Sequence, residues 1–145
     1  MSARRTALTI AAAFVVSQVL AVAVHGFLLA DDYGPFYGRL LRDQPGWPML
    51  LLPVAHLSFI CGLVWVYSRV AFEGSRLVRG VKLGALGFVM GQAPLWLLWF
   101  AEQPWPAGLV AKQLVLELAS SLVIGAAIAA VARMAAPARP SAAPA

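Results

Sequence analysis

Charge and cysteine are both scarce in this chain. Charged residues make up 12% of the 145 residues, while hydrophobic residues make up 61% and the mean hydropathy is +0.81. Soluble domains contain about 25% charged residues, so this composition indicates an integral membrane protein. The single cysteine, Cys61, excludes an intramolecular disulfide and paired-cysteine redox chemistry. Because Cys61 lies in an apolar run, we expect a small buried hydrophobe there.

Catalytic signatures are also missing. No serine, cysteine or paired-carboxylate arrangement indicates a hydrolase, so we do not expect an enzyme, although the sequence leaves that question open. The net charge of +5 does not indicate nucleic-acid binding, because the basic residues are spread over the connections between apolar runs. The positive-inside rule accounts for that distribution.

Four apolar runs, each about 20 residues or longer, can cross a bilayer. They cover residues 6–30, 47–68, 80–101 and 107–131, approximately. With their short connections they predict an all-α fold, an up-down bundle of four transmembrane helices. We assign residues 1–136 to this single membrane domain and residues 137–145, rich in Ala and Pro, to a disordered tail.

The first run could be mistaken for a signal peptide. Arg4 and Arg5 precede it, and Ala21-Val22-Ala23 resembles a cleavage site. The apolar stretch is longer than the roughly 7–15 residues of the apolar h-region of a signal peptide, and three further spans follow. We therefore expect the first helix to be retained in the mature protein.

The basic residues predict the orientation. Eight of the eleven Lys and Arg lie near the two termini or in the connection between the second and third runs, which leaves Arg39, Arg42 and Lys112 on the other side. Both termini should therefore be cytoplasmic. A composition rich in alanine, with Arg well ahead of Lys, is typical of GC-rich bacterial genomes. We expect a multi-pass protein of the bacterial inner membrane, with the lipid bilayer as its first partner.

A short amphipathic pattern follows the first run. Its apolar residues recur at helical spacing and are Tyr33, Phe36, Tyr37, Leu40 and Leu41. Such a pattern, rich in aromatics, predicts an interfacial helix between the first and second spans. It either anchors the chain at the membrane surface or forms a lid over an outward-facing cavity.

The third run carries a stripe of glycines. Gly80, Gly84, Gly87 and Gly91 are spaced by four, three and four residues, so they share one face of a helix. A second stripe, Ala55, Ser58 and Gly62, lies in the second run. Small residues let helix backbones approach closely in membranes. A phosphate-binding loop is excluded because no strand precedes the glycines.

Polar side chains inside the runs form the candidate site. From a rise of 1.5 Å per residue, each helix brings one of them roughly 14–18 Å below the outer surface. These are Gln18, His56, Gln92 and Glu117. Gln113 lies one turn from Glu117, and His25 lies nearer the surface, at about 7 Å depth on the same scale.

Several interpretations of this layer remain open. Polar side chains can bond across helices and only fix their register. Alternatively, Glu117 and His56 meet across the bundle and exchange a proton or bind a small polar ligand. Haem ligation by His25 and His56 is disfavoured by their different depths. A metal site from His25, His56 and Glu117 has suitable ligand types but no diagnostic spacing. We predict neither a metal nor another cofactor.

Two segments carry a resemblance to known proteins. They run from His25-Gly26-Phe27-Leu28-Leu29 to Asp32-Tyr33, and from Gln103-Pro104-Trp105-Pro106 through Lys112-Gln113 to Glu117. They resemble a family of small uncharacterised bacterial membrane proteins with four helices. The resemblance implies a four-helix inner-membrane fold over nearly the whole chain and supplies no catalytic or binding residue.

Two functional hypotheses follow from these features. The first is a structural or interaction protein, either a homo-oligomer or an accessory subunit of another membrane protein, built around the polar layer. The second is a proton-coupled or small-ligand transporter or channel that uses Glu117 and His56. A membrane enzyme or a haem- or metal-binding protein is a third and weaker hypothesis.

Overall fold

The computed structural model describes residues 1–42 and 46–132, so the predicted tail at 137–145 lies outside the described residues. In this part of the chain, four helical spans are long and apolar enough to cross a membrane. They are Ala3–Leu28, Trp47–Arg69, Arg76–Glu102 and Ala107–Val131. The predicted all-α bundle of four transmembrane helices is confirmed. Apart from one isolated bridge between Tyr37 and Leu41, the described residues contain no β-structure.

Two of the spans contain a wide, π-helical turn. In the first span, the Leu29 N–H bonds to the Val24 carbonyl five residues back, at 2.9 Å. In the third span, the Ala93 N–H bonds to the Phe88 carbonyl in the same way. The elements of the four spans are α1 (Ala3–Ala23) and η1 (Val24–Leu28), η3 (Trp47–Leu50) and α3 (Leu51–Arg69), α4 (Arg76–Gly87), η4 (Phe88–Gln92) and α5 (Ala93–Glu102), and α6 (Ala107–Val131). Such π turns occur frequently at functional sites.

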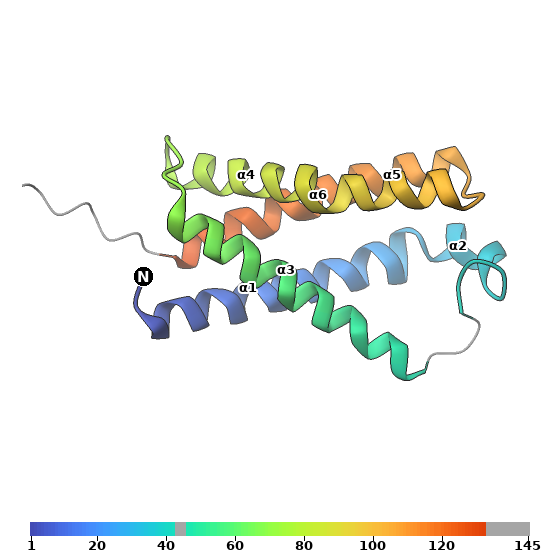
Figure 1. Ribbon diagram of the computed structural model, residues 1–145, viewed down its shortest axis with the longest axis horizontal. Helices are drawn as coiled ribbons and strands as arrows, with labels where there is room; N and C mark the ends of the chain where they lie inside the picture. The colour runs from blue at the N-terminus through green and yellow to red at the C-terminus, as the bar shows by residue number, and fades with distance from the viewer. Residues whose placement is uncertain (43–45, 133–145) are drawn as a thin grey trace, which may run out of the picture.

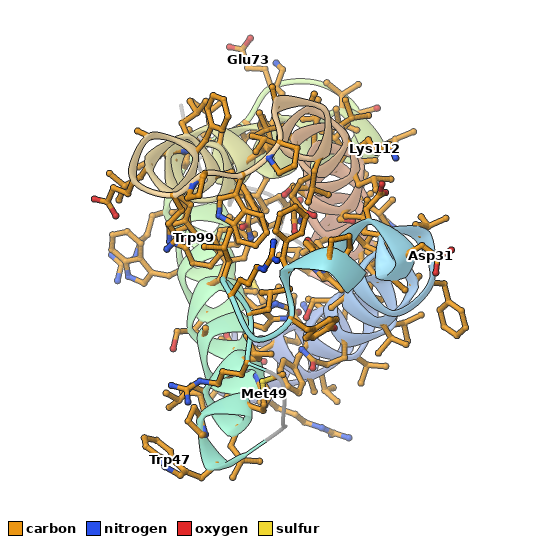
Figure 2. The ribbon with its side chains drawn as sticks, turned by 90° about the vertical axis from the view of Figure 1, so that its right-hand side faces the viewer. Asp31, Trp47, Met49, Glu73, Trp99 and Lys112 are labelled. Carbon is orange, nitrogen blue, oxygen red and sulfur yellow. The ribbon has the colours of Figure 1, made fainter. Side chains whose placement is uncertain are left out.

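The bundle has two distinct ends (Figure 1). At the terminal end, α1 begins, α3 connects to α4 and α6 finishes. At the opposite end, which we name the capped end, lie α2 (Ala30–Tyr33) and the turn between α5 and α6. Toward the capped end α3 diverges from α5, and Figure 2 shows Trp47 and Met49 of the second span far from Trp99 of α5.

Backbone contact between α4 and α6 holds the terminal half together. A Cβ added at Gly84 would lie 2.7 Å from Leu122 Cα and would overlap the Ser121 carbonyl oxygen. A Cβ added at Gly80 would lie 2.7 Å from Ala126 Cα. Glycine is required here because any side chain would force the two backbones apart. An apolar core surrounds this contact and includes Ala13, Ile60, Leu63, Val64, Tyr67, Leu83, Ile124 and Ile128.

The remaining two glycines of the predicted stripe face a different helix. A Cβ at Gly87 would lie 3.2 Å from the Phe59 ring and 2.8 Å from Leu63 Cδ2, and a Cβ at Gly91 would lie 3.0 Å from Phe59. Phe59 and Leu63 belong to α3. The stripe therefore contacts α6 near the terminal end and α3 in the middle of the bundle.

The second small-residue stripe points away from the bundle. Ala55, Ser58 and Gly62 are all exposed, and a Cβ at Gly62 would meet no atom within 4 Å. Cys61 beside them is also exposed, so the prediction that it is buried is wrong. Its apolar neighbours in the sequence suit a lipid-facing helix surface as well as a core, and the two cannot be told apart from hydropathy.

Residues 30–41, which follow the first span and which we call the cap, form a shorter helix than their apolar pattern predicts. The chain forms α2 and a 3₁₀ turn, η2 (Gly34–Phe36), and then turns at Gly38, whose φ of 73° is left-handed. The helix ends at Phe36, because Tyr37 is extended, and Gly38 then supplies the left-handed residue of the turn that follows. The cap packs onto the start of α6 through a second apolar cluster. Its buried members are Val24, Leu29, Tyr33, Trp105, Leu109 and Val110.

Candidate functional site

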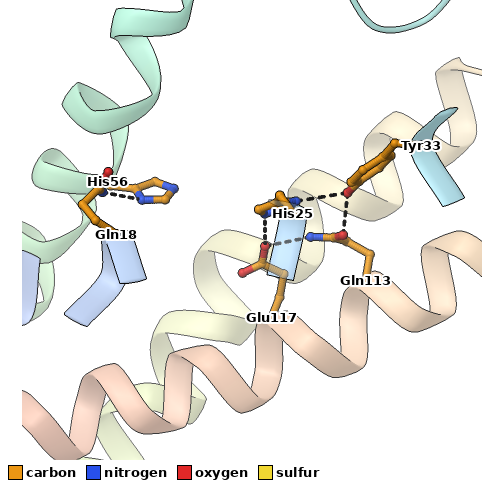
Figure 3. A network of polar contacts seen from close by, with 6 residues as sticks. All are labelled: Gln18, His25, Tyr33, His56, Gln113 and Glu117. Carbon is orange, nitrogen blue, oxygen red and sulfur yellow. Dashed lines mark hydrogen bonds and ion pairs between the residues drawn. The ribbon is translucent and has the colours of Figure 1, made fainter. Parts of the chain in front are cut away.

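A polar network centred on Glu117 lies between α6 and the end of the first span (Figure 3). Gln113 and Glu117 are one helical turn apart, and the Gln113 Nε2 donates to Glu117 Oε1 at 2.8 Å. The same carboxylate oxygen lies 3.4 Å from His25 Nε2. The Glu117 side chain is 16% exposed and the His25 side chain 40%, so the pair is partly shielded from the surroundings.

Tyr33 of the cap completes this network. Its hydroxyl donates to Gln113 Oε1 at 2.7 Å and lies 3.2 Å from His25 Nδ1. Burial raises the pKa of Tyr33, and the nearby Glu117 carboxylate raises it further, so the hydroxyl stays protonated. The apolar pattern of the sequence predicts Tyr33 on the interfacial helix and gives no sign that it belongs to the site.

The directions of these hydrogen bonds fix where protons sit. Tyr33 has one hydroxyl hydrogen, which it gives to Gln113, so the Nδ1–H of His25 must be the donor to the Tyr33 oxygen. His25 Nε2 then faces Glu117 Oε1 across 3.4 Å. A neutral His25 with its hydrogen on Nδ1 would present a lone pair to the carboxylate, which is repulsive. The contact between His25 Nε2 and Glu117 Oε1 is therefore favourable only when the pair holds one proton more than a neutral imidazole and an ionised carboxylate do.

His56 lies in a separate pair. Gln18 Nε2 and His56 Nδ1 are 2.9 Å apart, joining α1 to α3. Since an amide nitrogen donates, His56 Nδ1 accepts, and the neutral ring carries its hydrogen on Nε2. Glu117 and His56 do not contact each other directly, in contrast to the hypothesis from the sequence. Glu117 contacts His25 and Gln113 instead.

A small cavity joins the two pairs. It has a volume of about 30 Å³, and its wall includes His25, His56, Gln92 and Glu117. A buried water needs about 10–15 Å³, so there is room for about two water molecules. The cavity thus brings together residues from all four spans, and four of the six predicted polar side chains. The rest of the wall is made by Ser17, Leu20, Ala21, Val24, Phe59, Ser120, Ser121 and Ile124.

Both π turns lie at this cavity. His25 is part of η1, and Gln92 is the last residue of η4. A π turn rotates the residues that follow it relative to a regular α-helix. Gln18 does not line the cavity and reaches it through its bond to His56, while Gln113 reaches it through Glu117.

An ion pair lies on the outer surface of the cap. The Lys112 ammonium contacts the two Asp32 carboxylate oxygens at 2.9 and 2.8 Å, and thereby ties α2 to α6. The Lys112 side chain is 58% exposed, so this pair contributes little to stability. Lys112 of α6 therefore contacts the cap and lies apart from the cavity.

Metal ligation by His25 would disturb the observed hydrogen bonds. Both ring nitrogens of His25 are engaged, one by Tyr33 and one by Glu117. Among the described residues no three His, Cys, Asp or Glu side chains form a group that could hold a metal ion. Any metal at His25 would have to break one of those two contacts.

Comparison with known proteins gives no relative. No protein-family model, no curated protein and no solved structure matches the chain. The resemblance to small bacterial four-helix membrane proteins therefore stays a prediction. Function has to be argued from the geometry of the cavity.

Proposed function

We propose that this membrane protein binds and releases a proton at the His25–Glu117 pair, and that its activity is coupled to that proton. The observation that carries the proposal is the set of hydrogen-bond directions around His25. Tyr33 and Gln113 leave the contact between His25 Nε2 and Glu117 Oε1 favourable only with one proton shared between them. A network used only as structural glue would not need a titratable pair at its centre.

The position of the pair favours coupling over conduction. His25 and Glu117 lie on the capped side of the apolar core, which fills the terminal half with Ile60, Leu83 and Ile128, each 0% exposed. These side chains are apolar and would not carry a proton. Loss of the shared proton would instead weaken the contacts among His25, Glu117 and Tyr33, and so loosen the cap. We place the capped end outside the bacterial inner membrane and both termini in the cytoplasm, as the basic residues predict.

Infrared difference spectroscopy between acid and neutral pH tests the proposal on the full-length protein in nanodiscs. We expect the carboxyl band of protonated Glu117 to appear at acid pH and to be missing from Glu117→Gln. The matched control is Glu102→Gln, because Glu102 is exposed at the end of α5 and should leave the band in place.

A second pair of variants tests the role of the network. Tyr33→Phe removes the hydroxyl that fixes the His25 tautomer, so the band should move to a different pH range. Tyr37→Phe should leave it unchanged, because Tyr37 is 53% exposed. A band that is absent at every pH, or that ignores Tyr33→Phe, would contradict the proposal.

An accessory or oligomeric role is the second candidate. It is favoured by the exposed stripe Ala55, Ser58 and Gly62 on α3, which no other part of the described chain covers. Cys61 lies beside the stripe and is exposed, so it can report on a second copy. Under this candidate, oxidation in membranes should form a Cys61–Cys61 crosslink, and Gly62→Leu should abolish it. Absence of the crosslink would count against a homo-oligomer through this face.

A further inference from the structure

A cluster of basic side chains surrounds the connection between α3 and α4, at the terminal end of the bundle. Arg69 is the last residue of α3 and Arg76 is the first residue of α4, and Arg79 and Lys82 follow within the next turns of that helix. We call these four residues the basic turn. Between Arg69 and Lys82 the sequence contains a single acid, Glu73. The basic turn therefore carries a marked excess of positive charge.

This charge is not neutralised by acidic side chains of the described chain. The ion pairs made by Glu117 and by Asp32 both lie in the capped half. Arg69 and Arg76 are exposed and form no ion pair with any described residue. Figure 2 shows Glu73 projecting away from the bundle at its outer edge. An anion from outside the described chain is therefore needed to compensate the basic turn.

Two side chains of the basic turn reach back toward the membrane surface. Lys82 lies about 9 Å along α4 from Arg76, at a rise of 1.5 Å per residue. Its Nζ donates to the Glu73 carbonyl oxygen at 3.2 Å, and the Arg79 Nε donates to the Gly74 carbonyl oxygen at 2.9 Å. Cations near the end of a spanning helix extend in this way. A carbonyl oxygen holds a cation without neutralising it, and Lys82 keeps further ammonium hydrogens for an acceptor.

Apolar neighbours indicate that the compensating anion belongs to the membrane. Leu77 and Val78, which follow Arg76, are 65% and 43% exposed, and Val70, which follows Arg69, is 43% exposed. A nucleic acid or an acidic soluble protein would pair with the arginines but would leave these apolar side chains without an apolar partner. A phospholipid provides acyl chains for them and a phosphate for the cations. The planar guanidinium of arginine binds a phosphate through two parallel hydrogen bonds.

We propose that the basic turn binds the headgroups of anionic phospholipids, with Arg69, Arg76 and Lys82 directed at the phosphate. The attraction is electrostatic, so it decreases with added salt. The inference goes beyond the proposed function, because it concerns the terminal end of the bundle and involves no residue of the cavity.

The test measures which lipid lies next to the connection. Full-length protein carrying Cys61→Ser and Ala71→Cys is labelled with a fluorophore at residue 71, which is exposed, and is placed in phosphatidylcholine nanodiscs. Nitroxide-labelled phosphatidylglycerol or phosphatidylcholine is added, and the quenching of the fluorophore is recorded. We expect phosphatidylglycerol to reach half-maximal quenching at about a tenth of the mole fraction that phosphatidylcholine requires. Added sodium chloride should reduce this preference.

A second label position provides the matched control. Ala101→Cys replaces an equally small and exposed residue near the end of α5, at the capped end. A fluorophore there should be quenched equally by the two lipids, because it lies far from the basic turn along the bundle (Figure 1).

Removal of single charges locates the binding. Arg76→Gln should reduce the preference for phosphatidylglycerol at residue 71 about fivefold, as expected for one basic residue near an anionic surface. Arg76→Lys keeps the charge and should retain most of the preference. Arg39→Gln removes the same charge from the exposed side of the cap and should change nothing at residue 71. If Arg76→Gln does not fold, Arg69→Gln takes its place with the same expected reduction.

Four results would overturn the lipid site. They are equal quenching by both lipids at residue 71, an equal preference at residue 101, a preference that does not respond to salt, and a preference that survives both Arg76→Gln and Arg69→Gln. An equal reduction by Arg39→Gln would also overturn it, since only the net charge of the protein would then matter. A titrating Glu117 band would leave the protonation proposal intact in each of these cases.

Discussion

The two halves of the bundle are held together by opposite means. In the terminal half, Gly80 and Gly84 bring the backbones of α4 and α6 together inside an apolar core. In the capped half, both π turns widen their helices, α3 diverges from α5, and side-chain hydrogen bonds connect the elements. The half with close backbone packing therefore supports the structure, whereas the half joined by side-chain hydrogen bonds carries the titratable groups.

The largest effect should come from a methyl group in the terminal half. Gly84→Ala would place its Cβ against the Ser121 carbonyl and Leu122 Cα, where only backbone movement gives relief. We expect a loss of about 3 kcal/mol in the free energy of unfolding, measured by circular dichroism during denaturation in mixed micelles. Gly62→Ala is the matched control. It meets open space on α3 and should stabilise the helix by up to about 1 kcal/mol. Equal effects of both substitutions would remove the contrast between the halves.

A smaller effect should follow from removing one hydroxyl in the capped half. Tyr33→Phe leaves the Oε1 of Gln113, a residue that is 0% exposed, without its donor. The expected cost is about 1–3 kcal/mol, in the same denaturation measurement. Tyr37→Phe, on the exposed side of the cap, should cost almost nothing. A neutral result for Tyr33→Phe would show that the cap is held by apolar packing alone.

Alkaline pH should open the capped half before the terminal half. The folded-state pKa of Tyr33 is raised above its ordinary value near 10 by burial and by the Glu117 carboxylate. The contribution of Tyr33 to the free energy of unfolding is therefore complete below pH 10. It is lost as the pH rises above 10, by at most about 1.4 kcal/mol per pH unit. Tyrosinate absorbance and circular dichroism, recorded together for wild type and Tyr33→Phe, would test it. A wild type that loses no more stability than the variant above pH 10 would contradict the prediction.

The smallest effect should come from the ion pair on the cap. Lys112→Met removes a contact with Asp32 that is largely exposed, so we expect less than about 1 kcal/mol, decreasing with added salt. A double-mutant cycle with Asp32→Asn isolates the pair. A coupling energy well above that limit would show that charge, and not only packing, holds α2 on α6.

The fold could be predicted from the sequence because hydropathy and length determine membrane spans almost directly. The four apolar runs at about 6–30, 47–68, 80–101 and 107–131 correspond to the four spans observed. The Pro-rich turn after Glu102 and the basic connection after Arg69 mark where the chain reverses. The length of the cap could not be predicted from its apolar pattern, because the chain leaves the helix at Tyr37 and turns at Gly38, although the apolar spacing continues to Leu41.

The pairing inside the site could be predicted only in part. Converting sequence position to depth with a constant rise assumes straight α-helices, and η1 breaks that assumption next to His25. The cap also folds back so that Tyr33 contacts Gln113, a residue 80 positions away. Residue types therefore identified Glu117 and both histidines as candidates, but which histidine faces the carboxylate depends on tertiary packing.

The wide turn at η1 also determines the direction in which the cap projects. One residue of an α-helix corresponds to a rotation of about 100°. Deleting a single residue there, such as Gly26, would let the span continue as a regular helix and swing α2 about a quarter turn around the helix axis. The placement of the cap over the cavity thus depends on how many residues the span contains. A substitution leaves the number of residues in the span unchanged, whereas an insertion or a deletion alters it.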